Sequence, residues 1–106
     1  MPALAVDIVR FVDEHQPGFV ECRLLDAQGH THCFIEKVPV VSTENLSSSS
    51  TYPRPGTIAC QIVQRSMDGS RQLLKVNTEL PWHVESTTGA TEFVVALAQV
   101  EQNRER

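Results

Sequence analysis

Short stretches in which apolar and polar residues alternate recur along most of the chain. A period of two is typical of strands with one buried face. Residues 3–12 also fit helical spacing, but three Val and one Ile among these ten residues favour a strand. After Pro17-Gly18, the alternation returns in residues 19–25, 30–38, 56–65 and 71–78. Residues 92–97 are either a last strand or the start of a short helix, and the chain therefore predicts about six strands.

Residues 19–25 and 30–38 flank a short turn at 26–29, which predicts a β-hairpin. We expect Cys22 to lie opposite Cys33, with Ile35 on the same buried face. The other face then carries Glu21, Arg23, His30, His32 and Glu36. A one-residue bulge at Gly29 would shift this pairing. We prefer the register without the bulge because a slip exposes half of the apolar residues.

A second hairpin is predicted from residues 56–65 and 71–78 around the turn 66–70. With Gly69 in the left-handed conformation, Ile62 is expected opposite Leu74. Strands joined by hairpins are mostly antiparallel, and a chain of this kind covers its edges by forming a small barrel or a sandwich. The fold class predicted is therefore all-β.

The length of 106 residues fits one domain, which we place at residues 1–98. A Ser/Thr/Pro-rich stretch at residues 42–55, with four consecutive serines, is longer than the other connections and predicts a long polar loop. Loops of this length in compact domains are usually functional or disordered. Residues 99–106 are polar and are expected to form a C-terminal tail.

Charge and composition narrow the classes of partner. The net charge is -4, and the nine Lys and Arg residues are scattered among thirteen acidic ones. Binding to nucleic acid or to an anionic membrane is disfavoured, because such binding needs clustered basic residues. The acidic excess fits an ordinary cytoplasmic protein. A more specific explanation is that the chain binds a basic partner. The chain shows no apolar run of membrane-spanning length and no signal peptide, so we expect a cytoplasmic protein.

No motif in the chain identifies a catalytic residue. The three cysteines are an odd number and fall on predicted core faces, so neither a disulfide framework nor a reactive thiol is expected. His30 and His32 are two residues apart on one strand face and are the weak candidates for metal ligands. Zinc needs three or four ligands, however, and Cys33 points to the opposite face. We therefore expect neither a metal nor another cofactor.

The candidate binding residues lie in the connections between strands. Trp82 follows the fifth predicted strand, where it either caps the core or stands exposed as an anchor for a partner. His83 could form an acid–base pair with Glu85. Tyr52 and Arg54, on the long polar loop, are further candidate anchors.

Several segments together resemble a group of short bacterial proteins of unknown function. The segments are Pro17-Gly18-Phe19-Val20-Glu21, Asp26-Ala27-Gln28-Gly29-His30, Glu36-Lys37-Val38-Pro39-Val40, Tyr52-Pro53, Gly56 and Ile58-Ala59-Cys60. The resemblance covers most of the chain. It implies a bacterial source and a stand-alone domain, and it brings no activity and no catalytic residue.

These observations favour a non-enzymatic module that binds a protein partner. A neutralising partner of a toxin is one subtype, since such proteins can be small and acidic. The alternative is a small metal-binding protein or enzyme that uses the histidine face. A third class, a barrel that binds single-stranded nucleic acid, is disfavoured because an acidic chain with few aromatic residues lacks the basic, stacking groove. A homodimer formed through an exposed edge strand also stays open.

Overall fold

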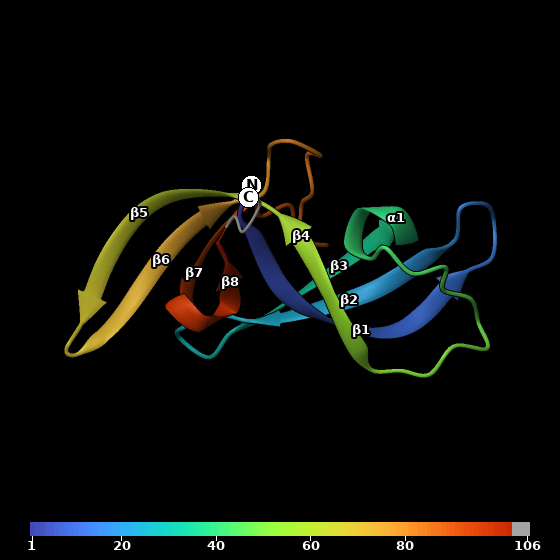
Figure 1. The fold of residues 1–106 in the computed structure, drawn as a ribbon, viewed down its shortest axis with the longest axis horizontal. Helices are drawn as coiled ribbons and strands as arrows, with labels where there is room; N and C mark the ends of the chain where they lie inside the picture. The colour runs from blue at the N-terminus through green and yellow to red at the C-terminus, as the bar shows by residue number, and fades with distance from the viewer. Residues whose placement is uncertain (103–106) are drawn as a thin grey trace.

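The computed structural model describes residues 1–102 (Figure 1). Its strands are β1 (Ala3–Asp13), β2 (Phe19–Leu25), β3 (Thr31–Lys37), β4 (Arg54–Ala59), β5 (Gln61–Asp68), β6 (Arg71–Asn77), β7 (Glu92–Ala96) and β8 (Val100–Glu101). A four-residue helix, α1 (Val38–Val41), follows β3, and a 3-10 turn, η1 (Leu97–Gln99), precedes β8. Strands make up 52% of the structure and helix only 7%, which confirms the all-β prediction.

The strands form two antiparallel sheets in a sandwich-like arrangement and not a closed barrel. The larger sheet has the order β3-β2-β1-β4, and β8 also pairs with the start of β1. The smaller sheet has the order β5-β6-β7. Helix α1 contacts both β3 and β4, the two outer strands of the larger sheet, and so packs across one end of it. Figure 1 shows the β5–β6 hairpin reaching away from the larger sheet.

One continuous core lies between the sheets. Its fully buried side chains include Leu4, Ile8, Val20, Phe34, Ile58, Leu74, Val76, Val84 and Val95. These residues come from both sheets and from the connection between β6 and β7, so the sheets share a single hydrophobic cluster. Gly56 of β4 has no room for a side chain. A Cβ at this position would lie 2.8 Å from the Ile8 side chain of β1.

The first hairpin corrects the predicted register by one residue. Cys22 pairs with Phe34 and not with Cys33. Phe34 is fully buried, whereas Ile35, which we expected on the buried face, is 40% exposed. His32 consequently lies on the same side of β3 as Phe34, with its ring centroid 4.9 Å from that of Phe93. The prediction of two histidines on a solvent face was therefore wrong for His32.

The shift arises in the turn. The Asp26 amide donates a hydrogen bond to the carbonyl of His30, 2.8 Å away, so the turn closes on residue 30 and not on residue 29. Gly29 has φ +88° and supplies the left-handed residue that this longer turn needs. The bulge that we considered and set aside is the arrangement present. This register buries Phe34 in the core, whereas the predicted register would bury Cys33 and Ile35 instead.

The second hairpin also differs in register. Ile62 pairs with Val76 instead of Leu74, and a bulge follows between Ile62 and Gln64. Gly69 is left-handed as predicted, with φ +64°. The predicted strand 56–65 is in fact two strands in different sheets, because the chain passes from β4 into β5 at Cys60. This change of sheet, together with β8, raises the number of strands described within residues 1–102 from the expected six to eight.

The structure places the end of the long loop and the start of the C-terminal tail differently from the prediction. The long loop spans residues 42–53, because Arg54 already belongs to β4. In the expected tail, Val100 pairs with Leu4 of β1, so regular strand structure continues past residue 98. Residues 103–106 of that tail lie outside the described residues. None of the helices among residues 1–102 has the length and apolar character needed to span a bilayer.

Candidate functional site

The connection between β6 and β7 carries two large apolar side chains on its surface. Residues 79–83, which we call the 79–83 loop, are all exposed. Within this loop, the exposed fraction is 57% for Leu80 and 62% for Trp82. Trp82 therefore does not cap the core, and of the two readings that its sequence position left open, the structure supports the exposed one.

The base of the 79–83 loop is closed by buried hydrogen bonds. The Val84 amide donates to the Thr78 carbonyl at 3.0 Å, and the Thr78 hydroxyl donates to the Val84 carbonyl at 2.6 Å. Thr78 and Val84 are both fully buried. A further bond, from the Thr78 amide to the Thr91 carbonyl at 2.9 Å, joins this base to the segment that leads into β7. The five residues of the loop are thus held at both ends on the core.

His83 ends the loop with an uncommon backbone. Its φ of +53° lies in the left-handed region, which a residue with a Cβ rarely adopts. Its Nε2 lies 3.1 Å from Oε2 of Glu85, and both side chains are largely exposed. The pair predicted from the spacing is therefore present in the structure. No third polar group of the described residues joins it, so the pair orients the imidazole and shows no catalytic arrangement.

Tyr52 and Arg54, the other candidate anchors, are engaged within the long loop. The Tyr52 hydroxyl donates to the Ser47 carbonyl at 2.7 Å, and its ring packs against the core. Arg54 forms an ion pair with Glu44 at 3.2 Å and donates to the carbonyl of Thr51. The structure gives both side chains partners within the same segment. Neither is brought near to the 79–83 loop by any contact among the described residues.

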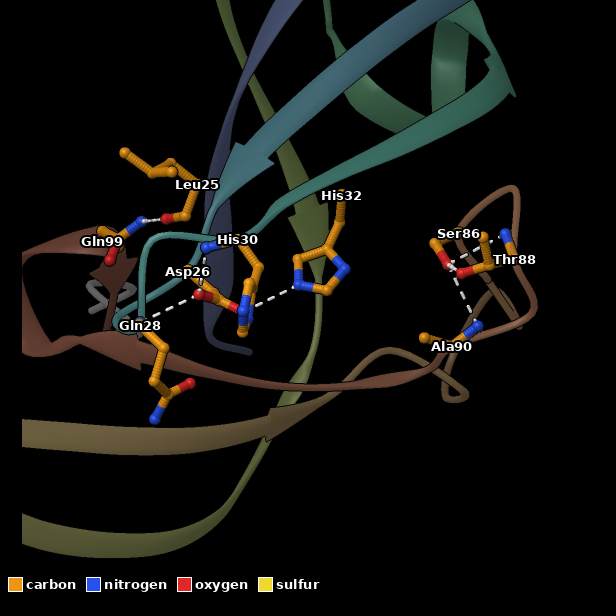
Figure 2. Close-up of polar contacts among 9 residues, drawn as sticks. All are labelled: Leu25, Asp26, Gln28, His30, His32, Ser86, Thr88, Ala90 and Gln99. Atoms are coloured by element: carbon orange, nitrogen blue, oxygen red, sulfur yellow. Dashed lines mark hydrogen bonds and ion pairs between the residues drawn. The ribbon is translucent and has the colours of Figure 1, made fainter.

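The two histidines of the first hairpin share a buried carboxylate (Figure 2). Asp26, whose side chain is 7% exposed, accepts a hydrogen bond from Nε2 of His32 at 2.8 Å. The same carboxylate accepts the backbone amides of Gln28 and His30, each at 2.9 Å. Nδ1 of His30 lies 3.7 Å away. Burial raises the pKa of Asp26, but the hydrogen bonds from His32, His30 and Gln28 outweigh it and lower the pKa below its usual value.

This turn also fastens the larger sheet to the smaller one. The Ala27 amide donates to the Val94 carbonyl of β7, and Arg71 of β6 donates to the Ala27 carbonyl, both at 2.8 Å. Gln99 of η1 donates to the Leu25 carbonyl at 2.8 Å. The Asp26 carboxylate therefore organises a structural junction. Sequence reasoning missed this role, although an Asp three residues before a Gly at a hairpin turn is the signal that indicates it.

Residues 1–102 contain no group of three or more His, Cys, Asp or Glu side chains placed to hold a metal ion. In the turn just described, the Asp26 carboxylate and His32 bind each other. Among the cysteines, Cys22 and Cys60 are fully buried, which raises the pKa of their thiols to about 12 and about 11. Negative charges on Glu36 and Glu21 add to the effect at Cys22. These two thiols are core residues, as predicted, whereas Cys33, which was also predicted on a core face, is only partly buried.

The buried hydroxyl of Ser86 is likewise structural. It accepts the backbone amides of Ala90 at 3.0 Å and Thr88 at 3.3 Å, and so holds the turn that Figure 2 shows. The neighbouring Thr87 amide donates to the Cys33 carbonyl at 2.8 Å, which attaches this segment to β3. These bonds form a turn at residues 86–90, which supports the far end of the β6–β7 connection.

Comparison with protein-family models, curated proteins and solved structures finds no significant match for this chain. Any inference about function therefore rests on the side chains of this chain and their arrangement. Other large apolar side chains are also exposed, among them Leu25 on β2 and Met67 on β5, but the 79–83 loop carries the exposed Trp, close to the exposed Leu80. Leu80 was not among the predicted binding residues, although a Leu and a Trp on either side of a Pro in a polar stretch are a visible signal.

Proposed function

We propose that this chain is a non-enzymatic protein-interaction module that binds a protein partner through the 79–83 loop. The observation that carries the proposal is the exposure of Trp82, 62%, on a loop whose base is closed by buried hydrogen bonds. Tryptophan is enriched among the residues that dominate binding energy at protein interfaces. A single exposed apolar residue is ordinary, but Leu80 and Trp82 stand exposed within three positions of each other.

The energy available from Trp82 is large for one side chain. Covering the exposed 62% of a side chain that buries roughly 200 Å² removes about 120 Å² from water. At about 25 cal/mol per Å², this burial contributes about 3 kcal/mol. Because Thr78 and Val84 already hold the loop, little backbone entropy of the loop is lost on binding, and this part of the cost of association stays small.

The test is capture of partners from the native cell extract on the tagged chain, followed by measurement of the dissociation constant. Trp82→Ala is compared with Met67→Ala, a matched control at 60% exposure on β5. We expect Trp82→Ala to weaken the binding of the true partner by at least about 30-fold. Met67→Ala should change the dissociation constant by less than about threefold. A partner that is a toxin would fit the subtype expected from the small size and acidity of the chain.

Stability measurements separate a binding effect from misfolding. Because Trp82 is mostly exposed, its replacement by Ala should leave the free energy of unfolding within about 0.5 kcal/mol of the wild-type value. The proposal is wrong if every partner is bound equally by wild type and Trp82→Ala, or if Met67→Ala weakens binding as much. Since Trp82 is the only tryptophan, a shift of its emission to shorter wavelength on binding is an independent readout.

A further inference from the structure

We propose that the partner of the 79–83 loop presents an apolar pocket bordered by Lys or Arg side chains. This inference rests on the proposed function, and it adds the chemistry of the partner. It is carried by the charge of the residues that precede and follow the loop in the sequence. An apolar centre with a charged border is the usual anatomy of a protein interface, in which the border governs the choice of partner and the association rate.

The part of the chain that carries the loop has charge of one sign. Residues 76–102 contain four Glu and neither Lys nor Arg. Two of these residues, Glu79 and Glu85, lie three positions before and after Trp82 and are exposed. The Glu79 carboxylate has no ion-pair partner among residues 1–102, and Glu85 contacts only His83 among the charged groups described. The two Glu residues that flank Trp82 in the sequence therefore have no ion pair with a Lys or an Arg among residues 1–102.

Four of the nine basic residues are engaged in other elements. Arg10 and Arg23 both pair with Glu21 on the larger sheet. Arg54 pairs with Glu44 in the long loop, and Arg71 is bound to a backbone carbonyl at the sheet junction. A second copy of the chain would bring the same two residues, Glu79 and Glu85, to the contact, and its net charge is also -4. Charge thus favours a basic partner over self-association.

The charge around the indole can be measured directly, because Trp82 is the only tryptophan. The probes are caesium and iodide ions, used as fluorescence quenchers at low ionic strength. In the double variant Glu79→Gln/Glu85→Gln, we expect iodide quenching to rise roughly twofold and caesium quenching to fall by a similar factor. The control Asp7→Asn/Asp68→Asn removes the same number of charges from β1 and β5. Equal quenching in wild type and the Glu79/Glu85 variant overturns the inference.

The second arm uses the partner recovered through Trp82. Between about 50 and 300 mM salt, the association rate of wild type should fall several-fold, since steering by charge is screened by salt. Glu79→Gln/Glu85→Gln should lower the rate at low salt by about three- to tenfold, and Asp7→Asn/Asp68→Asn by less than twofold. If the association rate changes neither with salt nor in the Glu79→Gln/Glu85→Gln variant, the inference of a basic border is overturned while the proposed function stands. If no partner depends on Trp82, the proposed function fails as well.

Discussion

Replacing Asp26 by Ala should destabilise the protein more than any other change at an acidic residue of the hairpin turns. The substitution removes one acceptor from three donors, the amides of Gln28 and His30 and Nε2 of His32. The side chain is 7% exposed, so water does not already share these contacts. The same turn bonds to β7 through Ala27, which means that a loosened turn also weakens the junction between the sheets.

The size of the effect follows from the donors left behind. A hydrogen bond contributes about 0.5–1.5 kcal/mol to stability, and one to a charged group about 1.5–3 kcal/mol. Gln28 and His30 are exposed, so water replaces part of what their amides lose. His32 is 23% exposed and keeps its ring packed against Phe93, and it has less access to water. We therefore expect a loss of about 2–3 kcal/mol, which corresponds to a fall in Tm of roughly 10–20 °C.

The effect should depend on pH in a defined direction. The hydrogen bonds that Asp26 accepts lower its pKa in the folded protein below its ordinary value of 3.8, against the opposing effect of burial. A group of this kind stabilises the fold above its unfolded pKa, and the stabilisation is lost as the pH falls through the folded pKa. The difference between wild type and Asp26→Ala should accordingly be full near neutral pH and shrink below about pH 4.

Urea denaturation followed by far-ultraviolet circular dichroism measures this difference at each pH. Trp82 fluorescence is unsuitable as the probe, because its indole is 62% exposed in the folded state. Asp68→Ala, at the exposed end of β5, is the control and should change the free energy of unfolding by less than about 0.5 kcal/mol. A loss below that value for Asp26→Ala at neutral pH, or a loss that persists unchanged at pH values well below 4, would refute the reasoning.

Three further changes test the rest of the structure. Phe34→Ala should lower the free energy of unfolding, measured in urea, by about 3–5 kcal/mol because the ring is fully buried, and Ile35→Ala should lower it by less than about 1 kcal/mol. The reverse order would support the register without the bulge. Gly56→Ala should lower stability by about 1–3 kcal/mol, since its Cβ would stand 2.8 Å from a side chain of β1, and an unchanged Tm would contradict the close packing. Cys22 and Cys60 should react with a thiol reagent near pH 8 only after unfolding, because burial raises the pKa of both thiols; a reaction of all three cysteines in the native protein would contradict this.

The strands were predictable because alternation is a local signal. Each stretch from residue 3 to residue 78 that alternates in the sequence is a strand in the structure, apart from the change of sheet at Cys60. The register of the first hairpin was not predictable in the same way. Cys33, Phe34 and Ile35 are three consecutive apolar residues, so the pattern does not say which of them faces inward. The structure buries the largest of the three, and the longer turn closed by Asp26 permits it.

The role of the turn could not be read from periodicity. Asp26 binds His32 across the hairpin, and Ala27 binds Val94, which lies 67 positions along the chain. Such contacts depend on how the two sheets meet, and strand patterns carry no information on this point. The same limit applies to Tyr52, where the sequence shows an aromatic residue on a polar loop. Only the structure shows that its hydroxyl is already bonded to Ser47.

Trp82 shows how a two-residue difference in position decides between core and surface. Val84 is fully buried, whereas Trp82 is mostly exposed, and the left-handed backbone of His83 lies between them. The aromatic part of the core is formed instead by Phe34 and Phe93, whose ring centroids are 5.6 Å apart. By its chemistry alone, a tryptophan that follows a strand fits either a core position or a surface position. The backbone turn at His83 and the aromatic pair already in the core leave the indole outside, exposed on the 79–83 loop.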